Sequence, residues 1–285
     1  MKINHVTVVG AGIMGHGIAQ VAAQAGLQVR LFDSDKESLA KGLKKIEKGL
    51  AALTAKGGIS ENQSNEIISR IILSESLTES VADADLVIEA IVEDMEAKKA
   101  LFSQLENTAP VKTIFASNTS SLSITEIGSI TKCPDRFIGL HFFYPVPIMA
   151  GIEVIQGIET SEATLESILE FIRLIGKEPL FSKDFPGFIV NRMLPLLVNE
   201  AFFLLWQGIG SPEDIDKACT LNLHHPIGPL KLADISGLDT LLAVLEYLHQ
   251  EFGEKYRPCP LLKQLVKAGH LGRKTGKGVF DYQTG

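Results

Sequence analysis

A histidine in an apolar run is the first residue of this chain whose surroundings indicate chemistry. His141 stands in RFIGLHFFYPVP, and twelve residues later Glu153 stands in GIEVI, among apolar neighbours that make an unpartnered carboxylate costly. If the two side chains pair, the carboxylate holds the Nδ1–H of the imidazole and stabilises its cation, so that Nε2 can take a proton from a hydroxyl group. A structural histidine and an exposed strand glutamate are the alternatives that the residues alone leave open.

A second pattern, VVGAGIMGHGIAQ, places glycines between an apolar run and a helical repeat at residues 8–20. Gly10, Gly12 and Gly15 have the GxGxxG spacing, which binds a dinucleotide when it lies between a strand and a helix. Gly10 would make the tight turn, Gly12 would let a pyrophosphate reach the backbone, and Gly15 would let the helix approach the strand. The helix N-terminus then offers free N–H groups and the positive end of its dipole to the phosphates.

The residue that closes the next apolar run, Asp33, completes this motif. It lies 23 positions after Gly10, where a carboxylate can bind the ribose 2′-hydroxyl of an adenosine and would repel a 2′-phosphate. Ser34 and Asp35 follow it, rather than an arginine. The motif therefore predicts NAD, not NADP, as the cofactor; a tight turn without a ligand is the alternative.

The stretch ASNTSSLSITE follows another apolar run and supplies hydroxyl and amide groups just before helical spacing begins. The residues concerned are Ser117, Asn118, Thr119, Ser120 and Ser121. Such groups cap helices, because they accept hydrogen bonds from free N–H groups, and capping is the simpler interpretation of any one of them. The functional interpretation places a hydroxyl beside the nicotinamide end of a bound cofactor.

Short β-rich runs alternate with helical segments through the first 185 residues, which predicts an α/β fold with a Rossmann-type, doubly wound sheet. The predicted strands cover residues 5–9, 28–33, 84–93, 112–117, 136–143, 152–157 and 178–182. After DFPGF the apolar residues follow helical spacing. We therefore expect an NAD-binding domain over residues 1–185 and an all-α domain for substrate binding and dimerisation over residues 186–285.

The segment at about residues 36–72 departs from the alternation and predicts a helical hairpin inserted into the sheet domain. Its first helix has apolar residues at four-three spacing and ends at Gly57-Gly58; its second starts with a capping-box signal, Ser60 with Gln63, and includes Ile71. Residues 36–56 contain six Lys and two Glu, a local charge of +4. The lysines on the face opposite the apolar stripe are Lys41, Lys45, Lys48 and Lys56. A solvated helix face is the simpler interpretation of this charge.

Composition excludes several classes of function. The 285 residues are 45% apolar and carry a net charge of −7, which argues against nucleic acid as a partner. No apolar run approaches the roughly 20 residues of a membrane span, and the N-terminal residues lack the features of a signal peptide, so we expect a cytoplasmic protein. The three cysteines lie far apart without CxxC spacing, so we expect free thiols and no metal site.

Eight stretches of the chain together resemble the short-chain (S)-3-hydroxyacyl-CoA dehydrogenases, especially the bacterial 3-hydroxybutyryl-CoA dehydrogenases. They are VVGAGIMGHGIAQ, VIEAIVEDMEAKKALF, FASNTSSLSITEI, GLHFFYPVPIM, DFPGFIVNRML, HHPIGPLKLAD, GLDTLL and LGRKTGKGVFDY. The resemblance covers essentially the whole chain in order. SNTSS, HFF and PGFIVNR are far more specific than a dinucleotide fingerprint.

This resemblance implies the reversible oxidation of an (S)-3-hydroxyacyl-CoA to the 3-ketoacyl-CoA with NAD, in fatty acid or butyrate metabolism. It implies that His141 is the general base and Glu153 its orienting partner, while Ser120 and Asn191 hydrogen-bond the substrate oxygen. The family's cofactor contacts carry over to Asp33, Glu93, Lys98 and Lys274, with Ser120 shared between cofactor and substrate. Lys56 matches a lysine that contacts CoA, which gives the basic helix face a purpose, because ammonium groups attract phosphates.

Four positions depart from the family pattern. Tyr144 replaces an asparagine that lies near the nicotinamide and the substrate, Ala150-Gly151 replaces Lys-Leu, and Ala52 stands where some bacterial relatives have a second CoA-contacting lysine. A bulky phenol in place of a short amide can change the acyl pocket or the cofactor contact. A related NAD-dependent hydroxy-acid dehydrogenase with a substrate other than a CoA thioester therefore remains the alternative.

Overall fold

The buried strands of the first part of the chain come together in one sheet. The computed structural model describes residues 1–282, and the chain divides after Phe188 into two units. In the first unit the described strands follow the order β3-β2-β1-β4-β5-β6-β7-β8. The strands are β1 (His5–Val9), β2 (Gln28–Phe32), β3 (Ile71–Ser74), β4 (Leu86–Glu89), β5 (Ile114–Ser117), β6 (Phe137–Phe142), β7 (Gly151–Gln156) and β8 (Glu178–Lys183).

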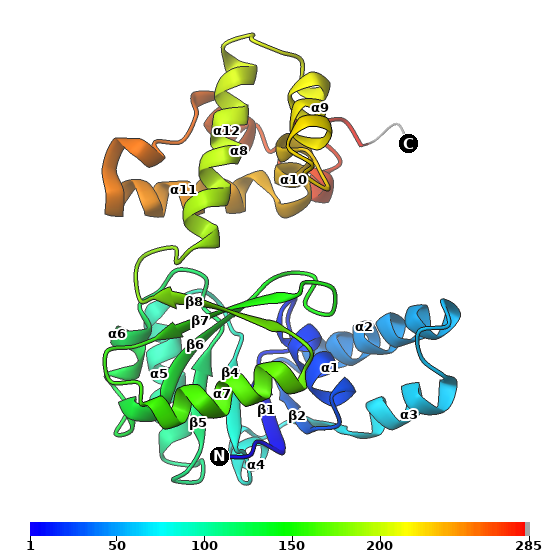
Figure 1. Ribbon diagram of the computed structural model, residues 1–285, viewed down its shortest axis with the longest axis vertical. Helices are drawn as coiled ribbons and strands as arrows, with labels where there is room; N and C mark the ends of the chain where they lie inside the picture. Colours follow the sequence, from blue (N-terminus) through cyan, green and yellow to red (C-terminus); the bar gives the residue numbers. More distant parts are fainter. Residues whose placement is uncertain (283–285) are drawn as a thin grey trace. The chain divides into compact units, whose positions relative to one another are not determined.

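Helices connect most of these strands, as the alternation along the sequence predicts. They are α1 (Gly15–Gln24), α2 (Lys36–Ala55), α3 (Glu61–Ser69), α4 (Leu77–Val81), α5 (Met95–Glu106), α6 (Ile124–Gly128) and α7 (Glu162–Leu174), with a short 3₁₀ helix, η1 (Pro134–Arg136). Figure 1 shows α7 on one face of the sheet and α5 and α6 on the other. The Rossmann-type arrangement expected from the sequence is confirmed.

Neighbouring strands of the described sheet are parallel except β6 and β7, which run antiparallel. The reason is the length of the connection. Only residues 143–150 join β6 to β7, and a crossover between parallel strands needs about a dozen residues or more. The two strands therefore pair directly, and residues that are distant along the sequence become neighbours across the sheet.

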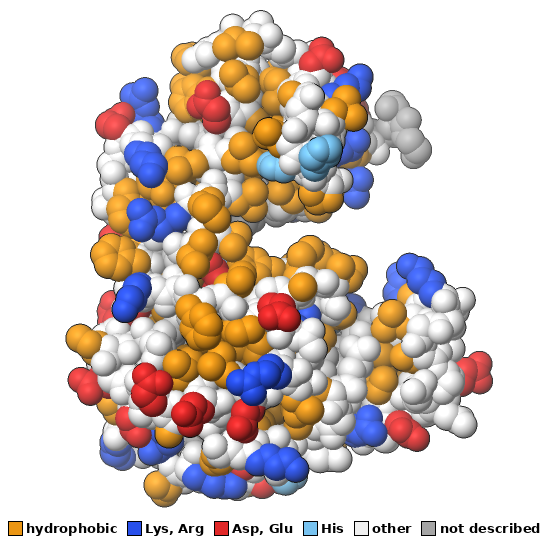
Figure 2. Space-filling view, viewed as in Figure 1, with side chains coloured by type: hydrophobic (Ala, Val, Ile, Leu, Met, Phe, Trp, Pro, Cys, Tyr) orange, Lys and Arg blue, Asp and Glu red, His pale blue; other side chains and the backbone are white. Residues whose placement is uncertain are grey.

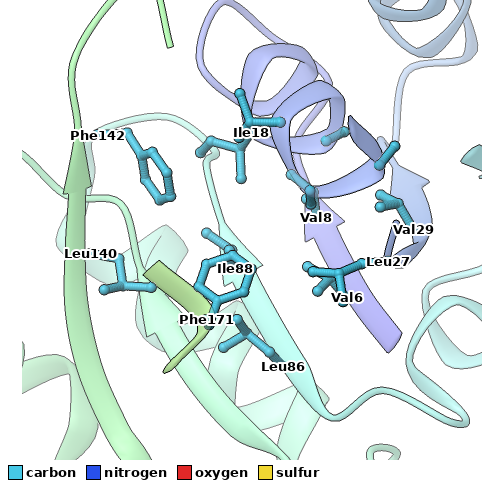
Figure 3. Close-up of a cluster of buried hydrophobic side chains, with 14 of the residues drawn as sticks. Val6, Val8, Ile18, Leu27, Val29, Leu86, Ile88, Leu140, Phe142 and Phe171 are labelled. Atoms are coloured by element: carbon cyan, nitrogen blue, oxygen red, sulfur yellow. The ribbon is translucent and has the colours of Figure 1, made fainter. Parts of the chain in front are cut away.

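Each face of the sheet has its own hydrophobic core. Side chains of α1, α2 and α7 pack on one face, where Ile18, Ile46 and Phe171 are buried. Figure 3 shows part of this core, with Val8, Ile88 and other strand side chains converging between α1 and the sheet. Helices α4, α5 and α6 pack on the opposite face. Because side chains alternate along a strand, each strand residue belongs to one of these two faces.

The inserted hairpin consists of α2 and α3, and its predicted end is wrong. Ser60 accepts from the Gln63 N–H at 3.2 Å and the Gln63 side chain accepts from the Ser60 N–H at 2.8 Å, which is the capping box expected from the sequence. However, α3 ends at Ser69, and Ile71 opens β3 instead of continuing the helix. Ile71 pairs with Val29 of β2, and this pairing with the sheet edge outweighs the local helical spacing.

The predicted strand over residues 84–93 is also too long. Strand β4 ends at Glu89, and the residues after it leave the sheet. The chain leaves the sheet beside the glycine turn that follows β1: a Cβ at Gly10 would lie 2.5 Å from the carbonyl oxygen of Ala90, so glycine permits this close passage. Glu93 lies on the loop that follows β4, not in the sheet.

The second unit is built from helices, as its apolar spacing predicts. They are α8 (Val190–Trp206), α9 (Pro212–Asn222), α10 (Pro229–Ser236), α11 (Leu238–Phe252) and α12 (Pro260–Lys267), with the 3₁₀ helices η2 (Gly253–Tyr256) and η3 (Arg273–Thr275). Phe202, Leu230, Leu245 and Leu262 form the centre of its core. Among the described residues of the whole chain, no helix combines the length and apolar character that crossing a membrane requires.

The capping box predicts how the hairpin responds to substitution. Ser60→Ala should lower the free energy of unfolding by about 1 kcal/mol, because the Gln63 N–H at the start of α3 loses its acceptor. Ser69→Ala is the matched control, since this exposed hydroxyl only donates to the Glu66 carbonyl in the last turn of the same helix. Chemical denaturation of both variants measures the effect; equal losses would show that the cap contributes nothing.

Candidate active site

His141 and Glu153 face each other across β6 and β7. The antiparallel register pairs these two residues directly, and side chains paired in this way have Cβ atoms about 5 Å apart. The imidazole Nδ1 lies 2.6 Å from Oε2 of Glu153. Glu153 is 0% exposed and His141 is also buried. The structure thus joins the two residues that the sequence singled out, through a strand reversal that the sequence analysis did not predict.

This contact determines which imidazole nitrogen can exchange a proton. A carboxylate accepts, so Nδ1 carries the hydrogen that it donates to Glu153, and Nε2 has the lone pair when the ring is neutral. The rings of Phe143 and Phe188 lie 4.4 Å and 5.9 Å from the imidazole centroid. They limit the orientations available to the ring. The geometry is that of a base held in one tautomer, whose cation is stabilised by a buried carboxylate.

Glu93 organises the loop that follows β5. Its Oε1 accepts from the hydroxyl of Thr119 at 2.6 Å, from Ser120 N–H at 2.8 Å and Oγ at 3.0 Å, and from Ser121 N–H at 3.2 Å. Burial opposes ionisation of Glu93, but the Lys98 ammonium and these donors outweigh burial and hold its pKa below the ordinary value. Two residues implied by the resemblance, Glu93 and Ser120, are therefore in direct contact.

Lys98 lies beneath this loop between two carboxylates. Its Nζ is 2.6 Å from Oε1 of Glu89 and 3.3 Å from Oε2 of Glu93. Glu89 also accepts from Ser117 Oγ at 2.6 Å and from Ile91 N–H at 2.7 Å. Burial raises the pKa of the Glu89 carboxyl, against the opposing influence of Lys98 and these donors. Sequence reasoning missed Glu89, although it closes an apolar run, the same signal that identified Glu153.

Packing against the protein requires glycine at two of the three positions of the motif, Gly10 and Gly15, but not at Gly12. A Cβ on Gly15 would lie 1.7 Å from the Gly10 carbonyl oxygen, and Gly10 itself has a φ of +104°. A Cβ on Gly12 would meet nothing within 4 Å. Protein packing therefore explains Gly10 and Gly15, whereas the open space at Gly12 suits the close approach of a ligand to the backbone.

Asp33 is tied to this loop. Its Oδ2 accepts from the Ala11 N–H at 2.7 Å and its Oδ1 from the Asp35 N–H at 2.9 Å. The carboxylate therefore stands at the end of β2 beside the glycine turn, where a ribose hydroxyl would be bound. These groups fit the adenosine and pyrophosphate parts of a dinucleotide.

Three further residues implied by the resemblance belong to the helical hairpin and to the second unit. Lys56 caps the C-terminus of α2 and is exposed, and Figure 2 shows Lys or Arg side chains at this end of the hairpin. Asn191 stands in the first turn of α8, in the second unit. Lys274, also in the second unit, forms an ion pair with Asp239 at 2.6 Å. Lys56 belongs to the first unit, and Asn191 and Lys274 belong to the second.

Two further buried or half-buried groups, absent from the sequence analysis, support the loops of the first unit. Asp184 accepts from Ser123 Oγ at 2.9 Å and from the N–H groups of Ile124 and Thr125 at the start of α6. Lys177 donates to the carbonyl oxygens of Val146 and Met149, at 2.7 Å and 2.6 Å. Burial lowers the pKa of this lysine. Their positions in the sequence carry no signal, because their partners are backbone groups that only the fold brings near.

Comparison with known proteins agrees with this arrangement. The NAD-binding domain of 3-hydroxyacyl-CoA dehydrogenases matches residues 5–185, and the C-terminal domain of the same enzymes matches residues 187–282. The chain belongs to the 3-hydroxyacyl-CoA dehydrogenase family. This membership makes it an NAD-dependent oxidoreductase, and the resemblance seen in the sequence is confirmed.

Three similar members of the family come from bacteria. A probable 3-hydroxybutyryl-CoA dehydrogenase of Bacillus subtilis is 48% identical over 284 residues, 99% of each chain. A 3-hydroxybutyryl-CoA dehydrogenase of Bradyrhizobium diazoefficiens is 47% identical over 99% of this chain and 96% of its own. The crystal structure of (S)-3-hydroxybutyryl-CoA dehydrogenase from Ralstonia eutropha, 44% identical, superposes with a TM-score of 0.94 over 99% of this chain and 100% of that one.

Replacement of the histidine tests the role of the cross-strand pair. His141→Ala should lower kcat by about 10²–10⁴-fold, the usual contribution of a positioned acid–base group, and leave the Kd for NADH nearly unchanged. Steady-state kinetics and fluorescence titration with NADH measure the two quantities. Turnover at the wild-type rate would remove His141 from the reaction.

Replacement of the glutamate tests the tautomer. In Glu153→Gln the amide offers the imidazole a donor as well as an acceptor, so the ring loses its fixed tautomer and the charge that stabilises its cation. We expect kcat to fall by at least about 100-fold, with a near-unchanged far-UV circular dichroism spectrum. An unaltered kcat in a folded variant would make Glu153 a purely structural residue.

Proposed function

We propose that the protein catalyses the reversible oxidation of (S)-3-hydroxybutyryl-CoA to acetoacetyl-CoA with NAD. The observation that carries this proposal is the buried contact of 2.6 Å between His141 and Glu153, on the same sheet as the glycine loop. The family accounts for the reaction class, and the relatives at 47–48% identity support the four-carbon substrate. Cytoplasmic fatty acid or butyrate metabolism, including β-oxidation, is the setting that we propose.

His141 performs the proton transfer. Its Nε2 removes the proton from the 3-hydroxyl of the substrate, and Glu153 stabilises the imidazolium that forms. When NAD is bound, its nicotinamide supplies the acceptor for the hydride that leaves C3. In the reverse direction the imidazolium returns the proton to the 3-keto oxygen. Ser120 and Asn191 hydrogen-bond that oxygen in this proposal.

The residues that would hold NAD follow from the chemistry of the groups present. Gly10, Gly12 and Gly15 provide bare backbone for the pyrophosphate, and Asp33 provides the acceptor for the ribose hydroxyls. On the nicotinamide side we propose Glu93, Lys98 and Ser120, which the structure joins in one network, and Lys274 from the second unit.

The CoA part of the substrate requires positive charge. Lys56 and the exposed lysines of α2 are the groups that we propose for its phosphates, in a protein whose net charge is −7. Tyr144, which is 60% exposed, stands two residues after the end of β6 and takes part in setting acyl-chain preference. We also propose that the protein acts as a homodimer formed through the second, helical unit.

An assay of substrate and cofactor preference tests the proposed function. With NADH, acetoacetyl-CoA should be reduced with a kcat/KM at least about 100-fold above that for free 3-keto acids, because the CoA contacts are lost in the free acids. NADPH should be the poorer cofactor, since its 2′-phosphate would meet the Asp33 carboxylate. A series of 3-ketoacyl-CoA substrates from four carbons upward is the control for chain length. Preference for a free acid, or for NADPH, would contradict the proposal.

A further inference from the structure

Strand β4 ends in a buried carboxylate, Glu89, to which the proposed function assigns no role. Glu89 is 0% exposed and Lys98 is 1% exposed. Their contact of 2.6 Å joins the end of the strand to the first turns of α5. A buried charge without a partner costs several kcal/mol, so the position of the ammonium depends on Glu89.

Glu89 is itself held from three directions. Its Oε1 accepts from Lys98 and from the Ile91 N–H, and its Oε2 accepts from the hydroxyl of Ser117 at 2.6 Å. Ser117 is the residue opposite Glu89 on β5. Strand pairing, a hydroxyl and a backbone amide thus fix this carboxylate, whereas Glu93 is 37% exposed on its loop.

Lys98 connects Glu89 to the loop after β5 through Glu93. Its Nζ is 3.3 Å from Oε2 of Glu93, and the other oxygen of Glu93 accepts from Thr119, Ser120 and Ser121. A continuous series of contacts therefore runs from the rigid end of β4, through the ammonium and the Glu93 carboxylate, to Ser120.

We propose that Glu89 is a positioning residue for cofactor binding: it anchors Lys98, which holds Glu93 and thereby the loop that carries Ser120. The proposal rests on the proposed function, since it requires the nicotinamide side of NAD to bind at this loop. Without the charge of Glu89, the buried ammonium would have only the partly exposed Glu93 carboxylate as an ionic partner. It would then shift toward Glu93 or lose its proton, and the loop would no longer be held in one arrangement.

Glu89→Gln tests the charge while preserving shape. We expect the Kd for NADH to rise about tenfold or more, because a contact to a charged group is typically worth that much, whereas kcat at saturating NADH, which depends on this loop only through Ser120, falls by a smaller factor. A merely structural role would not separate Kd from kcat in this way. Fluorescence titration and steady-state kinetics on the full-length protein measure both.

The matched control lies just before the other end of the same strand. Asp85 is also buried; it pairs with Lys112 at 2.7 Å and accepts from the N–H groups of Asn4 and His5. Asp85→Asn should lower the Tm and leave the Kd for NADH unchanged. If both variants weaken NADH binding equally, the effect of Glu89 is general destabilisation and the proposal is overturned.

A double variant tests whether Glu89 acts through Lys98. Glu89→Gln combined with Lys98→Met should bind NADH no more weakly than Lys98→Met alone. Once the Lys98 ammonium is gone, the Glu89 carboxylate has no cation to position. If the two substitutions instead raise the Kd for NADH by independent factors that multiply in the double variant, Glu89 does not act through Lys98 and the proposal is refuted. Should Glu89→Gln fail to fold, Ser117→Ala removes one hydrogen bond to Glu89 but keeps the charge; it should raise the Kd about two- to threefold, and an unchanged Kd would refute the proposal.

The wild-type protein separates this inference from the proposed function. Failure of the wild type to bind NADH and to reduce acetoacetyl-CoA would defeat the proposed function. An active wild type with an unaffected Glu89→Gln variant would defeat only the role of Glu89.

Discussion

A buried carboxylate that must be hydrogen-bonded is the constraint on which the rest of this structure depends. Glu153 has no exposure to water, and the Nδ1–H of His141, 2.6 Å away, donates to it. An isolated buried carboxylate would cost several kcal/mol. The partner is available because β6 and β7 run antiparallel and place the two residues opposite each other. The short connection between these strands is therefore as much a part of the site as the side chains.

A second buried carboxylate lies on β4, which β5 and β6 separate from β7 in the same sheet. Glu89 is the last residue of β4, and its carboxylate forms an ion pair with Lys98. Val87 and Ile155 pack in the core formed with α4, α5 and α6, so Glu89 and Glu153, each two residues away on its strand, point to that same face. One carboxylate orients the imidazole that we assign to proton transfer, and the other contacts the ammonium beneath the loop that we assign to the cofactor. Parallel sheets collect functional groups at their carboxyl edges, and here two buried acids organise them.

The glycine loop shows how packing and ligand binding can be separated at single residues. A side chain at Gly15 would clash with Gly10, and a side chain at Gly10 would clash with Ala90. Both glycines are therefore needed for the fold whether or not a ligand binds. Gly12 has no such contact. Family membership, the acidic residue at the end of β2 and this open position agree on NAD as the cofactor.

Sequence alone determined the class of fold, the NAD motif, the capping box at Ser60 and the residues of the His141–Glu153 pair, because each depends on local periodicity, local turn chemistry or the cost of a charge in an apolar run. The tertiary structure decided what depends on strand pairing. It placed Ile71 in an edge strand, ended β4 before Glu93, reversed β7 against β6, and brought Glu89 to Lys98 and Ser117. Pairing energies act between segments distant in sequence, so a local pattern contains no record of them.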